Sequence, residues 1–85
     1  MSANEVGAAF NAALERLARY LGSTDASEVM GQALRMARIQ GFPAAPEDLY
    51  RLGIMLEEHD LPQVTQVGVA LKVKALLMGV EDPFK

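Results

Sequence analysis

The chain has 85 residues, of which 51% are hydrophobic and 6% aromatic, with a formal net charge of −3 and no cysteine. This length predicts a single domain with a small core, and the hydrophobic content excludes a disordered chain. The acidic balance weighs against generic binding to nucleic acid or anionic membranes, and the lack of cysteine excludes disulfides and thiolate metal sites.

The first predicted element is a helix over residues 4–21. Its apolar residues recur every three or four positions, which is typical of a helix with one buried face. These residues are Val6, Phe10, Ala13, Leu14, Leu17 and Leu21. Gly22 and the turn residues after it predict the end of this helix.

A second helix is predicted over residues 25–40. Asp25 and Glu28 have the spacing of a capping box at its start, and Gly41 is expected to end it. Its expected buried side consists of Val29, Met30, Ala33, Leu34, Met36 and Ala37.

Residues 41–46 form the predicted linker and include the stretch FPAAP. Two prolines within four residues break a helix and hold the backbone extended. We expect a connector of fixed length whose Phe42 fills part of the core. The alternative is a polyproline segment that binds a partner, although the stretch matches PxxP only once, as PAAP, and the match is not repeated.

The third predicted helix spans residues 46–59. Pro46 suits the first turn of a helix, and Glu47 and Asp48 complement the dipole at its amino end. Asp60 and Gln63 again have the spacing of a capping box. They predict that the next helix begins after a very short turn. We therefore expect the third and fourth helices to form a tight antiparallel hairpin.

The stretch LYRLGIMLEEHDLPQ, residues 49–63, resembles the first arm and turn of a tetratricopeptide hairpin. Leu49, Leu52, Gly53 and Leu56 carry this resemblance. The second arm departs from it, because Thr65 and Lys72 stand where that family has small alanines, and the pattern is not repeated upstream. The resemblance covers about one fifth of the chain and implies a helix hairpin without assigning a family.

The fourth predicted helix, residues 61–79, is nearly all apolar and has two hydrophobic faces on a helical projection. One face consists of Val64, Val67, Leu71, Ala75 and Met78, and the opposite face of Val69, Val73, Leu76, Leu77 and Val80. Lys72 and Thr65 lie along one seam between these faces, and Lys74 lies along the other. Residues 67–74 also alternate as a strand would, but the run continues into the helical KALLMG and no second strand is available for pairing.

Each predicted helix contains one internal glycine, at positions 7, 31, 53 and 68. An interior glycine costs about 1 kcal/mol relative to alanine and is tolerated where another backbone passes closely. Gly53 and Gly68 are the best candidates for such a crossing, since they lie on neighbouring arms of the expected hairpin.

Few residues suggest chemistry. His59 is the only histidine, and its acidic neighbours are consecutive in sequence, so they do not converge on one ligand position. No nucleophile pattern, phosphate loop or zinc ligand set is present. We therefore expect no enzyme activity, no metal and no cofactor. The four internal methionines, Met30, Met36, Met55 and Met78, are interpreted as core residues, with an adaptable binding surface as the alternative.

The four predicted helices make an all-α, four-helix bundle-like domain over residues 1–85 with a tail at 81–85. We expect the chain to cover one face of the fourth helix and a partner to cover the other; the alternative is a monomer in which the first three helices cover the fourth completely. We expect a protein–protein interaction module that forms a homodimer or binds a partner helix, acting as an adaptor, assembly chaperone or regulatory subunit. The predicted partner interface is Val69, Val73, Leu76, Leu77 and Val80.

The alternative is a small helix-turn-helix regulator that binds DNA through Arg35, Arg38, Lys72 and Lys74. The apolar composition of the fourth helix argues against it, because a recognition helix needs polar side chains. The stretch MSANEVGAAF lacks the basic segment and apolar run of a signal peptide, and residues 61–80 carry two lysines and two glutamines. We expect a cytoplasmic chain that does not cross a membrane.

Overall fold

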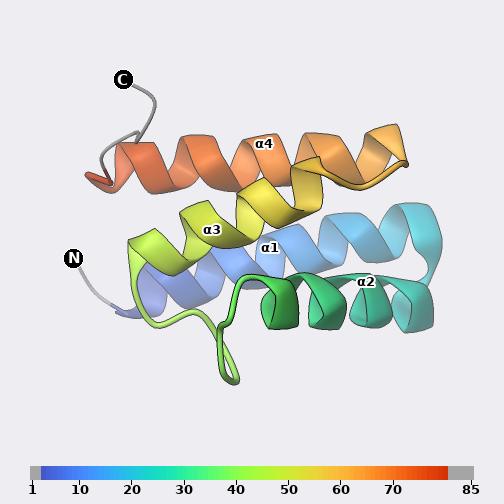
Figure 1. The fold of residues 1–85 in the computed structure, drawn as a ribbon, viewed down its shortest axis with the longest axis horizontal. Helices are drawn as coiled ribbons and strands as arrows, with labels where there is room; N and C mark the ends of the chain where they lie inside the picture. Colours follow the sequence, from blue (N-terminus) through green and yellow to red (C-terminus); the bar gives the residue numbers. More distant parts are fainter. Residues whose placement is uncertain (1–2, 81–85) are drawn as a thin grey trace.

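The computed structural model describes residues 3–80 and contains four helices and no strand within that range (Figure 1). The helices are α1 (Ala3–Leu21), α2 (Ser23–Met36), α3 (Pro46–Glu57) and α4 (Pro62–Leu77). The all-α prediction is confirmed, and the alternating residues of the fourth element are helical. The predicted tail, 81–85, lies outside the described residues.

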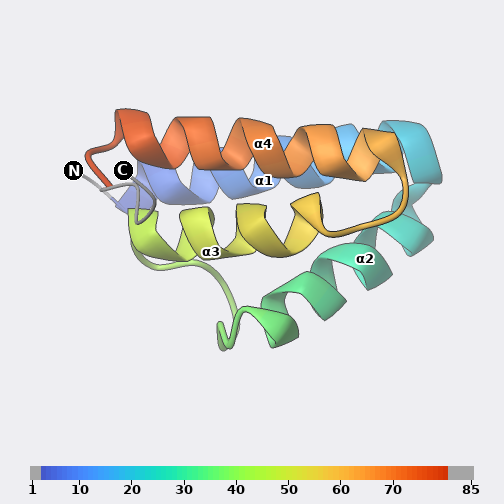
Figure 2. The same cartoon turned by 45° about the horizontal axis from the view of Figure 1, so that its top comes forward.

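The four helices run alternately up and down as two hairpins, α1–α2 and α3–α4 (Figures 1 and 2). The α3–α4 pair packs most intimately, and α1 lies against both α2 and α4. α2 touches α3 only lightly and makes no contact with α4. Figure 2 shows α2 diverging from α3 along its length.

The core is mainly aliphatic, with Phe10 and Tyr50 as its buried aromatic residues, and lies between the facing stripes of the helices. Its fully buried large side chains are Leu17, Met30, Leu49, Leu52, Leu56, Val6, Val64 and Val67. Among the described residues, no charged side chain is buried and no buried polar side-chain atom lacks a hydrogen-bond partner. Burial of apolar surface is therefore the main source of stability.

α2 begins two residues earlier and ends four residues earlier than the sequence predicts. Its N-cap is Gly22, without a side-chain hydrogen bond, so the capping box expected at Asp25 is wrong. At the other end Arg38 adopts a positive φ of 60°, and the Ile39 amide donates to the carbonyl of Leu34 at 2.9 Å. This Schellman arrangement ends the helix before Gly41 and turns the Ile39 side chain into the core.

α3 begins at Pro46, as expected, and Asp48 stabilises its first turn. The Asp48 carboxylate accepts hydrogen bonds from the backbone amides of Ala44 (2.9 Å) and Ala45 (3.3 Å) and pairs with Arg51. Burial acts to raise the pKa of Asp48, but these hydrogen bonds and the Arg51 charge outweigh it and lower the pKa below its ordinary value.

The linker does not place Phe42 in the core. The Phe42 side chain is 74% exposed and packs edge-on against the ring of Phe10, with the ring centroids 5.6 Å apart. Pro43 is the buried residue of this segment. The expectation of a core-filling phenylalanine is wrong because α2 ends early and the extended chain carries Phe42 across the surface.

The turn between α3 and α4 is short, as predicted, but Asp60 does not cap α4. The N-cap is Leu61, whose amide donates to Nδ1 of His59 at 3.2 Å. The Thr65 hydroxyl reaches back to this turn and lies 3.1 Å from the carbonyl oxygen of His59, with the carbonyls of Glu57 and Leu61 also in range. Thr65 therefore ties the start of α4 to the end of α3.

α3 and α4 cross with their backbones in contact at Gly53 and Gly68. A Cβ atom on Gly53 would lie 2.6 Å from the Gly68 carbonyl oxygen, and one on Gly68 would lie 2.6 Å from the Gly53 carbonyl oxygen. No such approach exists at Gly7 or Gly31. The prediction that residues 53 and 68 mark a close crossing is confirmed.

Candidate interaction surface

α4 presents the two apolar faces that its sequence predicts, and the chain covers only one of them. The inner face, which packs against α1 and α3, consists of the buried residues Val64, Val67, Gly68, Leu71 and Ala75. Met78, one residue past the helix, is buried with them.

The opposite face carries four exposed large hydrophobic side chains, which we call the outer strip. Their exposed fractions are Val69 43%, Val73 49%, Leu76 37% and Leu77 79%. Their positions follow the three- and four-residue spacing of one helical face. Half of the eight exposed large hydrophobic residues in the described chain therefore lie on this single surface.

Val80 differs from the other residues of the predicted interface. It lies beyond the end of α4, where its amide donates to the Ala75 carbonyl at 3.2 Å, and its side chain is partly buried against the core. The helix ends in the same Schellman arrangement as α2, with Gly79 in the left-handed region. The turn therefore directs Val80 inward and away from the outer strip.

Lys72 occupies the seam that faces α3. Its Nζ lies 2.8 Å from the Glu57 carboxylate and 5.6 Å from the centre of the Tyr50 ring. The Lys72 side chain is only 24% exposed and that of Glu57 28%. The charge of Lys72 is thus neutralised within the α3–α4 hairpin, beside the strip and outside it.

Lys74 occupies the opposite seam, where α4 faces α1. With Ala9 and Ala12 of α1 it borders two adjoining shallow hollows, of about 250 and 480 Å³. Leu77 borders the second hollow. The outer strip therefore has Lys72, neutralised by Glu57, along one edge and the exposed Lys74 along the other.

The four basic residues of the DNA-binding alternative do not gather on one surface. Arg35 and Arg38 belong to the end of α2, which makes no contact with α4, and Lys72 is paired with Glu57. α3 and α4 also lie side by side in antiparallel order (Figure 2). No observation in residues 3–80 favours DNA binding, which stays a prediction.

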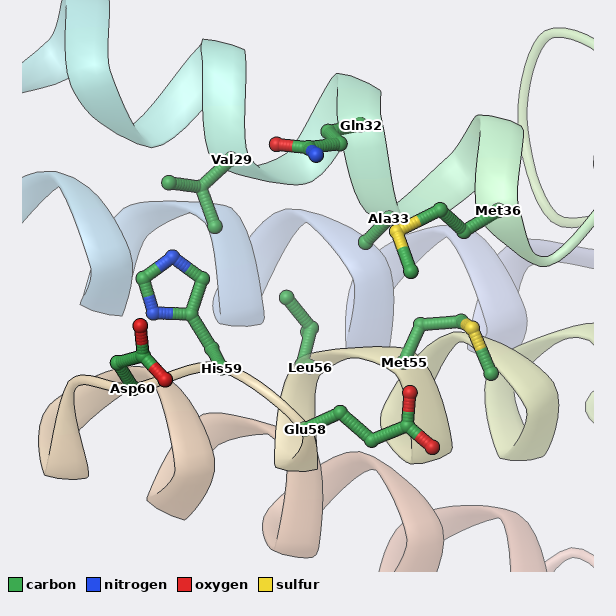
Figure 3. Close-up of a pocket in the computed structure, with 9 residues that line it drawn as sticks. All are labelled: Val29, Gln32, Ala33, Met36, Met55, Leu56, Glu58, His59 and Asp60. Carbon is green, nitrogen blue, oxygen red and sulfur yellow. The ribbon is translucent and has the colours of Figure 1, made fainter.

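A further hollow, of about 280 Å³, lies where α2 diverges from α3 (Figure 3). We call it the α2–α3 groove, and it is lined by Val29, Gln32, Ala33, Met36, Met55, Leu56, Glu58, His59 and Asp60. Sequence periodicity does not predict this groove, because it places Met36 on the buried side of the second helix, whereas Met36 is 53% exposed. The methionines thus divide into buried Met30 and Met78 and groove-lining Met36 and Met55.

Among the described residues, no three histidine, aspartate or glutamate side chains converge to hold a metal ion. Within the same residues, no helix has both the length and the apolar character needed to cross a bilayer. Comparison with protein-family models, curated proteins and solved structures finds no match to this chain.

Proposed function

We propose that this chain is a small helical protein–protein interaction module that self-associates through the outer strip of α4. The observation that supports this proposal is the exposure of Val69, Val73, Leu76 and Leu77 on α4, whose opposite face is already buried within the chain. Contiguous apolar surface of this kind is a common mark of protein interaction sites, because its burial releases water at little cost.

A second copy of the chain is the partner that suits the strip best. The strip contains no charged residue, so two copies can face each other without like-charge repulsion, and Lys72 at its edge is neutralised by Glu57. Two-fold dimers, which use the same patch on both subunits, are the commonest oligomers. A helix from another protein is the remaining candidate for the same surface.

Sedimentation equilibrium of the wild-type chain and of Val73→Asp and Leu77→Asp variants tests the proposal. We expect the wild type to dimerise reversibly and each variant to stay monomeric at the same concentration with unchanged helix content by circular dichroism, because a buried carboxylate without a partner opposes association.

Met36→Asp is the matched control. Met36 and Leu77 are both exposed apolar residues at the last position of their helices, so the two substitutions place the same charge in the same helical context. We expect Met36→Asp to dimerise like the wild type. A wild type that remains monomeric at millimolar concentration rules out the homodimer, and loss of helix content in both strip variants assigns the strip to the core.

A further inference from the structure

The α2–α3 groove combines an apolar floor with flexible walls. Val29 and Ala33 of α2 face Leu56 of α3 across it, and the Met36 side chain points from α2 toward Met55, whose side chain runs along α3 (Figure 3). Methionine is unbranched and polarisable, so it adapts to differently shaped apolar groups. A volume of about 280 Å³ accommodates one or two aliphatic side chains of a partner, not a whole helix.

The rim of the groove is acidic at the end of α3. Glu58 and Asp60 both line it and are exposed, and no lysine or arginine lines it. Neither carboxylate has an ion-pair partner among residues 3–80. The carboxyl end of α3, with its partial negative charge, points to the same place, so the electrostatic potential there favours a cation.

His59 adds a directed polar group between the floor and the rim. Its Nδ1 accepts the hydrogen bond from the Leu61 amide, so the hydrogen of the neutral ring resides on Nε2. Figure 3 shows the ring lying across the groove between the end of α3 and Val29. The groove therefore offers an apolar floor, a hydrogen-bond donor and, along its rim on either side of His59, two unpaired carboxylates.

We infer that the α2–α3 groove is a second binding site, separate from the outer strip, for a peptide segment of another protein that carries a leucine or methionine next to lysine or arginine. The aliphatic side chain enters between Met36 and Met55. Neighbouring cations of the segment pair with Glu58 and with Asp60, whose carboxylates lie on opposite sides of His59 (Figure 3). This assignment does not depend on self-association through α4.

Methionine-methyl NMR provides a test with internal controls. The probes are two synthetic helical peptides with leucines at helical spacing that are identical except that one carries lysines where the other carries glutamates. With the chain labelled at its methionine methyl groups, we expect the lysine peptide to shift the Met36 and Met55 signals and to leave those of buried Met30 and Met78 in place. The glutamate peptide is expected to bind at least tenfold more weakly.

Two variants separate this site from the outer strip. Combining Glu58→Gln with Asp60→Asn is expected to weaken binding of the lysine peptide about threefold to tenfold, because two exposed charge pairs are lost. Leu77→Asp is expected to leave the affinity for the lysine peptide unchanged. The inference is overturned if neither peptide shifts Met36 and Met55, if both peptides bind equally, or if Leu77→Asp abolishes the shifts.

Discussion

Gly53 and Gly68 set the distance between α3 and α4 by lacking side chains. Each glycine lies against the carbonyl oxygen of the other, and the Glu57 amide is 2.7 Å from the Cβ position of Gly68. These neighbours are backbone atoms, which cannot move aside as the end of a flexible side chain can. A single methyl group at either position therefore forces the two helices apart along the most intimate contact in the molecule.

Gly53→Ala and Gly68→Ala are each expected to lower the free energy of unfolding by about 1–3 kcal/mol, the usual cost of overpacking, despite the better helix propensity of alanine. Urea denaturation measures this change. Gly7→Ala is the control, because a Cβ there meets nothing within 4 Å, and it is expected to stabilise the fold by about 0.5–1 kcal/mol. Equal stabilisation by all three substitutions would contradict the close crossing.

Asp48 gives the first turn of α3 a pH-dependent stability. Its pKa is lowered in the folded chain, so its contribution is present above the unfolded pKa of about 3.9 and is lost as the pH falls through the folded value. We expect Asp48→Asn to cost about 1 kcal/mol at pH 7 and much less near pH 3, measured by urea denaturation at both pH values.

Glu47→Gln is the control for Asp48→Asn. Glu47 is also an acid in the first turn of α3, but it is exposed and does not share the hydrogen bonds to Ala44 and Ala45. We expect Glu47→Gln to lower the free energy of unfolding at pH 7 by less than Asp48→Asn does, and we expect this loss to change less between pH 7 and pH 3. Similar pH profiles for the two variants would assign the effect to the helix dipole alone.

At the scale of the element, α4 is the helix that sequence reasoning describes best. Helical periodicity separates Val64, Val67 and Leu71 from Val69 and Val73, and the structure buries the first set and exposes the second. The helical projection also predicts which side chains lie at the seams between its two apolar faces. It does not predict the partners of these side chains. The ion pair of Lys72 with Glu57 and the hydrogen bond from Thr65 to the His59 carbonyl depend on how α3 and α4 pack together.

The ends of the helices are predicted less well, for physical reasons visible at particular residues. Capping patterns place acids such as Asp25 and Asp60 at helix starts, but the backbone is already turned by Gly22 and Pro62. The end of α2 depends on Arg38, a residue that rarely adopts a positive φ. This left-handed residue turns Ile39 into the core, and which residue after a helix becomes buried depends on tertiary packing as well as on local sequence. The α2–α3 groove was not predicted, because helical periodicity places Met36 on the buried side of the second helix and does not show that α2 diverges from α3.

At the scale of the whole molecule, the proposed dimer couples stability to concentration. If only the folded chain associates, a hundredfold increase in protein concentration raises the stability of the dimer by up to about 2.7 kcal/mol. We expect the midpoint of thermal unfolding to rise accordingly for the wild type, measured by circular dichroism in cells of different path length. Leu77→Asp is expected to show a midpoint independent of concentration, and a wild type that behaves in the same way would contradict the dimer.

The direct backbone contact between α3 and α4 also determines which part of the molecule can move. At this crossing the backbones of α3 and α4 touch directly, so the two helices cannot slide past each other easily. In contrast, α2 touches α3 only lightly, and Gly22 and residues 37–45 join it to its neighbours. Widening of the groove therefore separates α2 from α3, the weaker of its two helix contacts, while the α3–α4 hairpin stays fixed.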